Sequence, residues 1–493
     1  MESVWRQYLE KTPLRERRGG TEGDGVVDRV VSLDTVVVGG GIAGIMCAYM
    51  LSKSGHKVTL IEAHKILEGV TCGTTAKITA LQGNYQNIPT KRKRRLYFQS
   101  QVEAVEGIAN LGIDCDFERV DSFVYGARKE IKKEYKVMRK FAPVEHFEKK
   151  HLPFGVHDCI KLSNQAQFNP IKFCYGLLGG FDVIENCRIK KVILTRKRLL
   201  TEHTSLRAGR SNPDTQSMPT AFKYKRLIIA TGFPIVNIRG MYSFKMYKSS
   251  SYAVCVNYPT ASGPPLRRSK GSFSLEGIYN AIADDGLMYR ECEDGIIIDG
   301  LGHRTGKMKC DHYFDILKQE SKKLPSSTPT TKKTPLLEKG VARSDGVFEW
   351  AANDCMTFDS VPYAGRLLRF RARNAYVITG FNKWGMTNSY VCTKIVDDII
   401  NKRKNRFRRL YKPTRILNIK VWPAFLWNFL QDGLGLLAGL FSSGKRRCPH
   451  MGCRLKFNKN TRTFDCPCHG SRFTDKGDII VSPAVDANDA LSS

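Results

Sequence analysis

The feature that most constrains the fold is a glycine-rich turn between an apolar strand and an apolar helix. Gly39, Gly41 and Gly44 occupy the G-x-G-x-x-G positions, directly after the run Val36–Val38 and at the start of a helical pattern that reaches Leu51. In this motif the first glycine turns the chain, the second lets a pyrophosphate approach the backbone, and the third lets the helix pack on the strand. The pattern predicts a Rossmann-like unit that binds a dinucleotide.

A second apolar strand follows the helix and ends in a carboxylate. The strand is Val58–Ile61, and Glu62 stands 18 residues after Gly44. In dinucleotide-binding units an acidic residue near this position accepts hydrogen bonds from ribose hydroxyls. These features predict that the following residues contact the cofactor: Gly39, Gly41, Ile42, Ala43, Gly44 and Glu62.

The C-terminal segment contains a metal-binding pattern. Cys448 and His450 form a Cys-x-His pair, and Cys466 and His469 form a Cys-x-x-His pair a short distance later. Two thiolates and two imidazoles suit either a zinc ion or a 2Fe-2S cluster with two histidines on one iron. The four side chains are therefore predicted metal ligands, and both metals are open at this stage.

Composition narrows the class of protein. The 493 residues include 79 Lys and Arg against 47 Asp and Glu, a formal net charge of +32 that favours an anionic partner such as a phosphate-rich cofactor. Eleven of the 15 cysteines are scattered singly before residue 448, and the first 30 residues contain no apolar run. We therefore expect a reducing compartment and a cytoplasmic location.

The longest apolar stretch, Val421–Phe441, is interrupted by polar side chains. It contains Asn428, Gln431 and Asp432. A membrane-spanning helix rarely tolerates such residues, so the stretch predicts an amphipathic helix and a membrane span is not expected.

Two basic runs, Lys91–Arg95 and Lys402–Arg415, account for part of the positive charge. Neither lies in a recognisable nucleic-acid-binding fold, so we interpret them as a solvated basic surface and expect no nucleic-acid partner.

Several separated motifs carry a resemblance that covers about residues 34–484. They are Gly39–Ala63, Gly73–Thr79, Gln165–Pro170, Gly302–Gly306 and Gly380–Asn388, followed by Cys448–Cys453 and Cys466–Ser471. This set is similar to the FAD-dependent oxidoreductases of the D-amino-acid-oxidase (glycine oxidase-like) superfamily that carry a C-terminal Rieske domain. The resemblance implies two cofactors, FAD and a Rieske-type 2Fe-2S cluster.

The resemblance and local chemistry together extend the set of expected FAD contacts. Thr74, Thr75 and Lys77 would supply hydroxyls, backbone amides and a cation to the phosphates or to the flavin edge. A second loop follows a strand end, where backbone amides face the flavin pyrimidine ring. Its expected contacts are Gly380, Phe381, Trp384, Gly385 and Met386.

For the cluster, the resemblance implies that Cys448 and Cys466 bind one iron and that His450 and His469 bind the other. It also implies a disulfide between Cys453 and Cys468, and a hydrogen bond from Ser471 to a cluster sulfur. These pairings follow from the family's two ligand loops.

The expected fold class is α/β, with a Rossmann-like FAD-binding domain, an α+β substrate lobe and a small all-β Rieske-type domain. We expect a flexible N-terminal extension over residues 1–32, the oxidoreductase over 33–415, a helical linker over 416–445 and a short Rieske domain over 446–493. Within the oxidoreductase, the FAD-binding domain is expected to comprise 33–90, 155–235 and 345–415. The substrate lobe is expected to comprise 91–154 and 236–344.

The implied function is oxidation of a small organic substrate, an amine or an amino acid, at FAD. Electrons would then pass singly through the cluster to an external acceptor, or enter from a donor if the flow is reversed. The alternative is a redox-sensing or electron-transfer module without substrate turnover, which docks a protein or nucleic acid through its basic surface.

Overall fold

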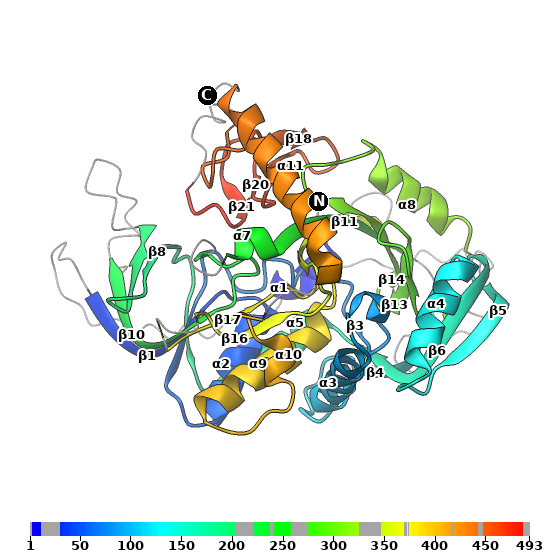
Figure 1. Cartoon of the computed structure of the whole chain (residues 1–493), viewed down its shortest axis with the longest axis horizontal. Coiled ribbons are helices and arrows are strands. Elements are labelled where there is room, and N and C mark those ends of the chain that lie inside the picture. The colour runs from blue at the N-terminus through cyan, green and yellow to red at the C-terminus, as the bar shows by residue number, and fades with distance from the viewer. Residues whose placement is uncertain are drawn as a thin grey trace.

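The computed structural model in Figure 1 contains two large β-sheets and a small third one, with helices on the outside. The structure describes residues 2–10, 30–202, 220–236, 241–257, 275–324, 347–368, 372, 374–415, 419–441 and 447–486.

The first sheet has eight strands and a parallel centre. Its path is β16-β17-β10-β1-β2-β7, and β8 and β9 extend it through β10. β17, β10, β1, β2 and β7 pair in parallel, as apolar strands covered on both faces do. The bounds are β1 (Val30–Val38), β2 (Val58–Ile61), β7 (Asp182–Ile184), β8 (Ile189–Ile193), β9 (Arg198–Thr201), β10 (Ala221–Ile229), β16 (Tyr363–Arg366) and β17 (Ala375–Thr379).

Three long helices cover this region: α2 (Ile42–Lys53), α9 (Gly385–Ile400) and α3 (Lys91–Ala109). Most residues of α2 and α9 are buried, because α2 packs on both the sheet and α9. A buried amide contact joins α3 to α9, in which Gln101 Nε2 donates to Asn388 Oδ1 at 2.9 Å. One face of the sheet and these helices thus share an apolar core, and the other face packs in a second apolar cluster.

The second sheet has nine strands and is mostly antiparallel. Its path is β15-β11-β14-β13-β12-β4-β6-β3, with β5 paired to β6 and one parallel pair, β12 with β4. The bounds are β3 (Lys77–Ile78), β4 (Glu118–Gly126), β5 (Glu145–Leu152), β6 (Gly155–Gln167), β11 (Met246–Val256), β12 (Gly277–Ala281), β13 (Met288–Cys292), β14 (Gly295–Arg304) and β15 (Val347–Thr357). Helices α4 (Arg128–Met138), α5 (Pro170–Gly176), α7 (Tyr242–Lys245), α8 (Tyr313–Ser321) and α10 (Arg408–Tyr411) are peripheral.

The sheet membership of three strands differs from the expected division of the chain. One is the short β3, which was expected in the FAD-binding domain (33–90) but pairs with β6. Residues 155–167 and 347–357 were expected in the FAD-binding domain, but β6 pairs with β4 and β15 pairs with β11 in the second sheet. The strand with which a segment pairs decides the sheet to which it belongs. Here the partner strands, β4 and β11, lie about 40 and 100 residues away in the sequence. The second sheet is therefore larger than the expected substrate lobe.

The first described residues are not the loose extension that was expected. Residues 2–10 include helix α1 (Arg6–Glu10), and Val4 and Trp5 are buried in the main core. The indole Nε1 of Trp5 donates to the carbonyl of Thr74 at 2.6 Å. Apolar burial and this bond fix the segment against a loop of the cofactor region, and β1 already begins at Val30.

The basic run Lys402–Arg415 is not solvated throughout. Arg415 is almost fully buried, and its guanidinium pairs with Asp359 at 2.6 Å and stands 3.9 Å from the ring centre of Tyr363. At least this cation serves the fold rather than the surface.

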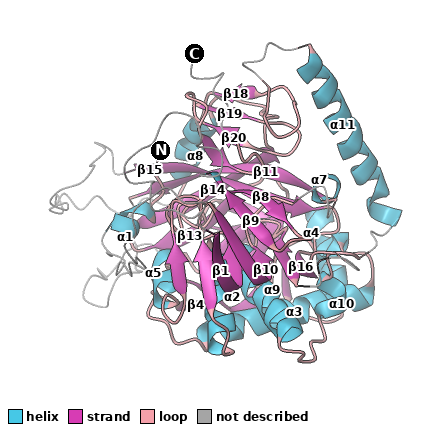
Figure 2. Ribbon diagram, turned by 90° about the vertical axis from the view of Figure 1, so that its left-hand side faces the viewer, coloured by secondary structure: helices cyan, strands magenta, loops and turns pink. Residues whose placement is uncertain are grey.

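The last described strands form a small sheet, and helix α11 (Trp422–Leu440) stands to one side of it, as Figure 2 shows. The four strands are β18 (Lys456–Asn458), β19 (Thr463–Asp465), β20 (Arg472–Phe473) and β21 (Ile479–Val481), and all pair antiparallel. Helix α11 precedes them and lies within the segment expected to be a helical linker. Among the described residues, no helix is both long and apolar enough to cross a bilayer.

Candidate functional site

A cavity of about 1280 Å³ opens at the carboxyl ends of the parallel strands. Its lining includes the glycine turn after β1, the end of β2, the loop 71–75 and the loop after β17. Residues of the second sheet form another wall of the cavity. Residues of α11 and of the small sheet also line it. Every residue expected to contact FAD lines this cavity except Gly44.

The glycine turn has the geometry that its motif demands. Gly39 has φ +114°, and a Cβ there would lie 2.5 Å from the carbonyl oxygen of Ala230. A Cβ on Gly44 would overlap the carbonyl oxygen of Gly39. Gly44 therefore lets α2 approach β1 closely, which explains why it lies behind the cavity wall.

Replacing Gly44 with Ala should displace α2 from the turn. We expect a loss of about 1–3 kcal/mol in stability and a lower FAD content, because the added methyl has no free volume. The melting temperature and the ratio of flavin absorbance to protein absorbance measure both effects. Gly433→Ala is the control, since a Cβ at that helical position meets no atom within 4 Å. Full flavin content in Gly44→Ala would contradict the assigned close approach.

Two side chains hold the turn from outside. Glu62 accepts hydrogen bonds from the backbone NH groups of Gly40 (2.5 Å) and His64 (3.0 Å). Thr71 Oγ1 accepts the NH of Ile42 at 2.9 Å, at the first residue of α2. Thr71 was not expected from the sequence, because a lone threonine 29 residues downstream carries no motif.

The loop 73–76 is clamped in place by residues distant in the sequence. Trp350 Nε1 donates to the carbonyl of Gly73 at 2.9 Å, and Trp5 donates to Thr74. The buried guanidinium of Arg290 donates to the carbonyls of Thr75 (2.8 Å) and Ala76 (2.9 Å). The loop is thus rigid before any ligand binds, as a precise binding site requires.

Lys77 is buried at the cavity wall and paired with Asp299 of β14, Nζ to Oδ1 at 2.8 Å. Burial lowers the pKa of Lys77, and the Asp299 charge opposes that shift. Asp354 on β15 lines the same cavity. Burial raises the pKa of Asp354 to about 6, and the positive charge of Lys383 opposes that shift. The wall therefore combines cations and carboxylates in one partly desolvated patch.

The loop after β17 turns sharply into α9. Gly380 has φ +76°, and Asn382 and Lys383 also adopt positive φ values of 53° and 68°. Helix α9 then starts at Gly385, with Trp384 as the preceding residue. This turn aims the first backbone NH groups of the helix at the cavity, which also has Phe381 and Met386 in its lining.

The four predicted metal ligands lie in two loops beside the small C-terminal sheet, one before β18 and one between β19 and β20, and they meet in two pairs. Cys448 and Cys466 are buried, and their thiols are hydrogen-bonded, which lowers the pKa of Cys448. Ser471 adds a further hydrogen bond to Cys448. The imidazoles of His450 and His469 stand edge to face, with ring centres 5.1 Å apart.

Both imidazoles are held in the neutral form that binds metals. Burial lowers the pKa of His450 to about 4 and that of His469 to about 3, where the neighbouring His450 adds to the shift. Within the described residues, Nδ1 of His469 is buried without a hydrogen-bond partner. A buried imidazole nitrogen in that state is typical of a ligand atom.

Cys453 and Cys468 form a disulfide, with a Cα–Cα distance of 6.6 Å, as the resemblance implied. The bridge ties the two ligand loops to each other. The Sγ atom of Cys466 lies within 4.8 Å of both bridged sulfurs, but only Cys466 retains a thiol to offer a metal.

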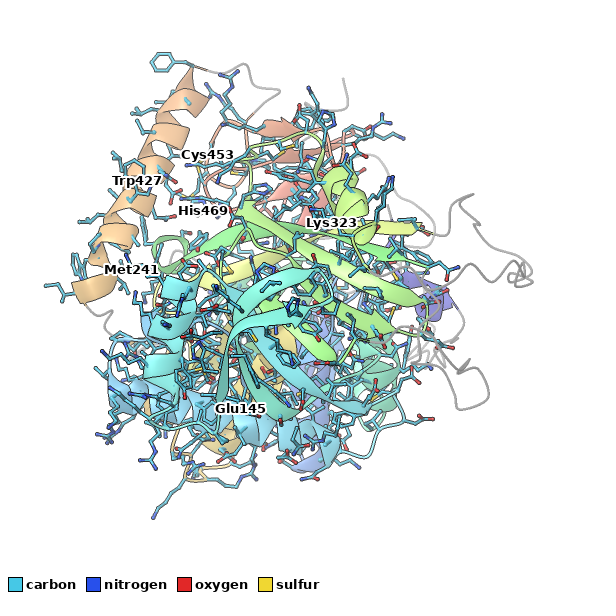
Figure 3. The ribbon with its side chains drawn as sticks, turned by 90° about the vertical axis from the view of Figure 1, so that its right-hand side faces the viewer. Glu145, Met241, Lys323, Trp427, Cys453 and His469 are labelled. Carbon is cyan, nitrogen blue, oxygen red and sulfur yellow. A yellow bond between two sulfur atoms is a disulfide. The ribbon has the colours of Figure 1, made fainter. Side chains whose placement is uncertain are left out.

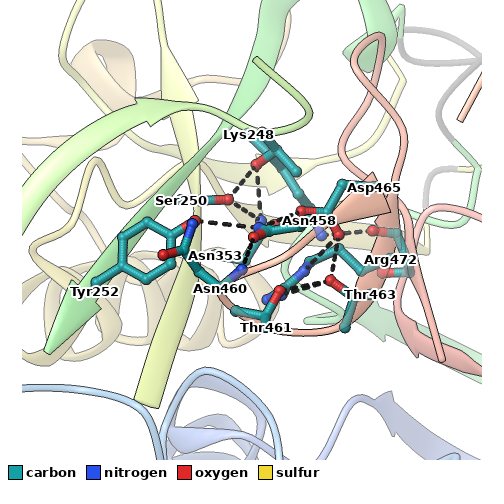
Figure 4. Close-up of polar contacts among 12 residues, drawn as sticks. Lys248, Ser250, Tyr252, Asn353, Asn458, Asn460, Thr461, Thr463, Asp465 and Arg472 are labelled. Carbon is teal, nitrogen blue, oxygen red and sulfur yellow. Dashed lines mark hydrogen bonds and ion pairs between the residues drawn. The ribbon is translucent and has the colours of Figure 1, made fainter. Parts of the chain in front are cut away.

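The small sheet is docked on the second sheet through buried polar contacts, drawn in Figure 4. Asn458 Nδ2 donates to the hydroxyl of Tyr252 at 3.1 Å and to Asp465 at 3.0 Å. Arg472 pairs with Asp465 at 3.0 Å, and both side chains are buried. Lys248 on β11 donates to the carbonyl of Ser482, so the last strand also contacts the cavity wall.

Arg304, at the end of β14, connects the second sheet to both the second ligand loop and α11. It donates to the carbonyls of Pro467 (3.1 Å) and Cys468 (2.9 Å) in the second ligand loop. The same guanidinium donates to Gln431 at 2.9 Å and pairs with Asp432 at 2.5 Å on α11. The sequence did not single out Arg304 for this role, because its partners lie 127 or more residues away.

A parallel sheet with a glycine turn at its carboxyl edge, closed by an antiparallel sheet, is the architecture of a dinucleotide-dependent oxidoreductase. The chain belongs to the FAD dependent oxidoreductase family, which it matches over residues 34–399. It also matches the Rieske [2Fe-2S] domain over residues 435–491. FAD and a 2Fe-2S cluster are accordingly its cofactors, and the resemblance drawn from the motifs is confirmed.

One relative matches the chain over nearly its whole length. The chain is 26% identical over 507 residues to YhfW of Bacillus subtilis (strain 168), named as a Rieske 2Fe-2S iron-sulfur protein, covering 92% of each. Among solved structures, it resembles glycine oxidase from Geobacillus kaustophilus (TM-score 0.58, 17% identity, 79% of this chain and 100% of that one). It also resembles L-proline dehydrogenase from P. horikoshii (TM-score 0.57, 17% identity, 78% and 98%).

Proposed function

We propose that this protein oxidises an amine or amino acid at FAD and passes the electrons one at a time through its Rieske cluster to an external acceptor. FAD accepts two electrons from an organic substrate, and a 2Fe-2S cluster carries one at a time. A chain that binds both cofactors can therefore accept an electron pair from a substrate at FAD and release the electrons singly through the cluster.

The proposed FAD site uses the glycine turn, the loop 73–77 and the loop after β17. The pyrophosphate would lie at the N-terminus of α2, against the backbone of Gly41, Ile42 and Ala43, where the helix dipole favours negative charge. Glu62 would exchange its present backbone partners, in part, for the adenosine ribose. The amides at the start of α9 would face the flavin ring. The full proposed set is Gly39, Gly41, Ile42, Ala43, Gly44, Glu62, Thr74, Thr75, Lys77, Gly380, Phe381, Trp384, Gly385 and Met386.

The proposed cluster ligands are Cys448, His450, Cys466 and His469. The two buried thiols in mutual contact suit one iron, and the two neutral imidazoles suit the other. The hydrogen bond from Ser471 would remain near the sulfur atoms of the site, where it tunes the potential. The disulfide leaves Cys453 and Cys468 outside the ligand set.

The observation that carries the proposal is the continuity of the cavity. Its lining runs from the glycine turn to Arg472 and residues 478–485 of the small sheet. His469 also stands with its ring centre 6.2 Å from that of Phe233, which follows β10 at the same sheet edge. The proposed flavin and cluster sites would therefore lie near the same edge of the first sheet, which favours electron transfer between them.

The substrate class is supported by the charges in the wall. A zwitterionic substrate carries a carboxylate and an ammonium, and the wall offers Lys77 and Lys383 beside Asp299 and Asp354. The two structural neighbours, a glycine oxidase and an L-proline dehydrogenase, both act on amino acids. We propose a cytoplasmic location, supported by the eleven cysteines before residue 448, which form no disulfide.

The test is an anaerobic titration of the purified protein with a panel of amines and amino acids. We expect one class of compound to bleach the flavin absorbance and then to produce the reduced Rieske EPR signal. Bleaching without the EPR signal would contradict the electron path. A flavin that no compound reduces, in a protein whose cluster still exchanges electrons with an added protein, would favour the electron-transfer module without turnover.

A further inference from the structure

Helix α11 is oriented with its polar side toward the protein. Asn428 and Asp432 are 4% and 7% exposed, and Asp432 pairs with Arg304. Gln431 accepts hydrogen bonds from Arg304 and from Lys307. The inner face is completed by glycine, because a Cβ on Gly435 would lie 2.7 Å from Cys468 Sγ.

The apolar side of the same helix faces outward. Figure 3 shows α11 at the edge of the molecule with Trp427 labelled on it, and Trp427 also lines one side of the cavity. The exposed apolar residues of the segment have exposed fractions from 49% to 91% and are Trp422, Leu426, Trp427, Phe429, Leu430, Leu434, Leu437, Leu440 and Phe441. Surface helices of soluble proteins show the reverse arrangement, with apolar residues inward.

This outer face is a strip rather than a scattered set. The helix has 19 residues, which corresponds to about 28 Å of length at 1.5 Å per residue. Half of the exposed large hydrophobic residues in the described part of the chain belong to this one segment. A continuous strip of this size marks an interaction surface.

We propose that α11 lies flat on an anionic lipid surface, with its outer face in the boundary between headgroups and acyl chains. Leucine, phenylalanine and tryptophan on one side of a helix are the side chains that insert at this depth, and tryptophan prefers the interface itself. The helix does not meet the requirement for a span, so it would rest on the surface. This proposal does not rest on the proposed function.

The net charge of the chain favours a lipid surface, rather than a second copy of this chain, as the partner of the exposed face of α11. The net charge of +32 attracts anionic headgroups but opposes the approach of another chain with the same charge. Arg454 is exposed, and its backbone NH donates to the carbonyl of Gly435, so a cation stands beside the helix. Lys445, Arg446 and Arg447 follow four residues after the end of the helix in the sequence.

The experiment is vesicle flotation with the full chain loaded with both cofactors. We expect the protein to float with phosphatidylcholine vesicles that contain phosphatidylglycerol, and to bind less to phosphatidylcholine alone or in about 1 M salt. The triple variant Leu430→Ser, Leu434→Ser, Leu437→Ser should bind at least about tenfold more weakly, because three apolar side chains no longer insert. Flavin and cluster absorbance verify that the variant is folded.

The matched control replaces three exposed valines outside α11, in Val30→Ser, Val102→Ser, Val156→Ser, and should float like the wild type. Tryptophan emission gives an independent readout. Of the five tryptophans, Trp422 and Trp427 are exposed and the other three are buried, so a blue shift on adding anionic vesicles reports α11.

Several results would overturn the proposal. Wild-type protein that binds neither vesicle type refutes it, and equal binding to neutral and anionic vesicles refutes the electrostatic part. Light scattering that detects a dimer, lost in the triple variant while vesicle binding is absent, would assign the face to a second copy. Capture of a protein partner on this face without vesicle binding would likewise refute a lipid surface.

Discussion

Cys466→Ser should abolish the Rieske EPR signal and reduce the iron content from about two atoms per chain to nearly none, while FAD stays bound. The thiolate is the ligand, and a serine hydroxyl is a far weaker donor to iron. Cys466 is buried against Cys448, and no other thiol replaces it once Cys453 and Cys468 are bridged. Metal analysis, EPR of the reduced protein and the flavin spectrum measure the three quantities.

Cys310→Ser is the matched control, because Cys310 is a free and partly exposed thiol outside the C-terminal region. It should retain full iron and flavin. Iron at the wild-type level in Cys466→Ser would show that the ligand set is wrong, and zinc in place of iron in the wild type would refute the cluster. Loss of flavin together with iron would mean that the two cofactor regions do not fold independently.

The second large effect is expected from Arg304→Met, which should slow electron transfer from flavin to cluster by at least about tenfold. The side chains of Arg304 and Asp432 are both largely buried, so removing one partner leaves a buried charge and costs about 3–5 kcal/mol. Burial already raises the pKa of Asp432 to about 6, against the opposing Arg304 charge. Loss of Arg304 raises that pKa further and also removes two hydrogen bonds to the second ligand loop.

The measurement is photoreduction of the flavin without substrate, followed by the rate at which the cluster becomes reduced. Each cofactor should still be present at full occupancy in Arg304→Met, which separates a docking defect from a binding defect. Arg304→Lys keeps the positive charge and should recover part of the rate. Arg128→Met, which breaks an exposed pair with Glu148, should have no effect. An unchanged rate in Arg304→Met would contradict the docking role.

Some features of this protein follow from the sequence because their determinants are local. The turn between β1 and α2 needs glycine at three nearby positions, and the two metal hooks each occupy a few consecutive residues. The helical nature of residues 422–440 is likewise expressed in a local apolar pattern. Short-range geometry fixes all three, so residue type and spacing suffice to predict them.

Other features depend on partners that are far away in the sequence. β6 and β15 belong to the second sheet because they pair with β4 and β11. The apolar pattern within a strand does not specify which strand it pairs with. Lys77 pairs with Asp299, which is 222 residues away in the sequence. Trp5 donates a hydrogen bond to the carbonyl of Thr74, which is 69 residues away. Sequence spacing contains no signal for such contacts.

The orientation of α11 separates the two kinds of information most clearly. The sequence by itself determined that Val421–Phe441 forms a helix with one polar and one apolar side. Only the tertiary structure decided which side faces the protein, because Arg304 and Lys307 lie against the helix there and donate to Gln431 and Asp432. A buried charge such as that of Arg304 needs polar partners. Asn428 and Asp432 therefore face the protein, and the leucines on the opposite side of the helix are exposed.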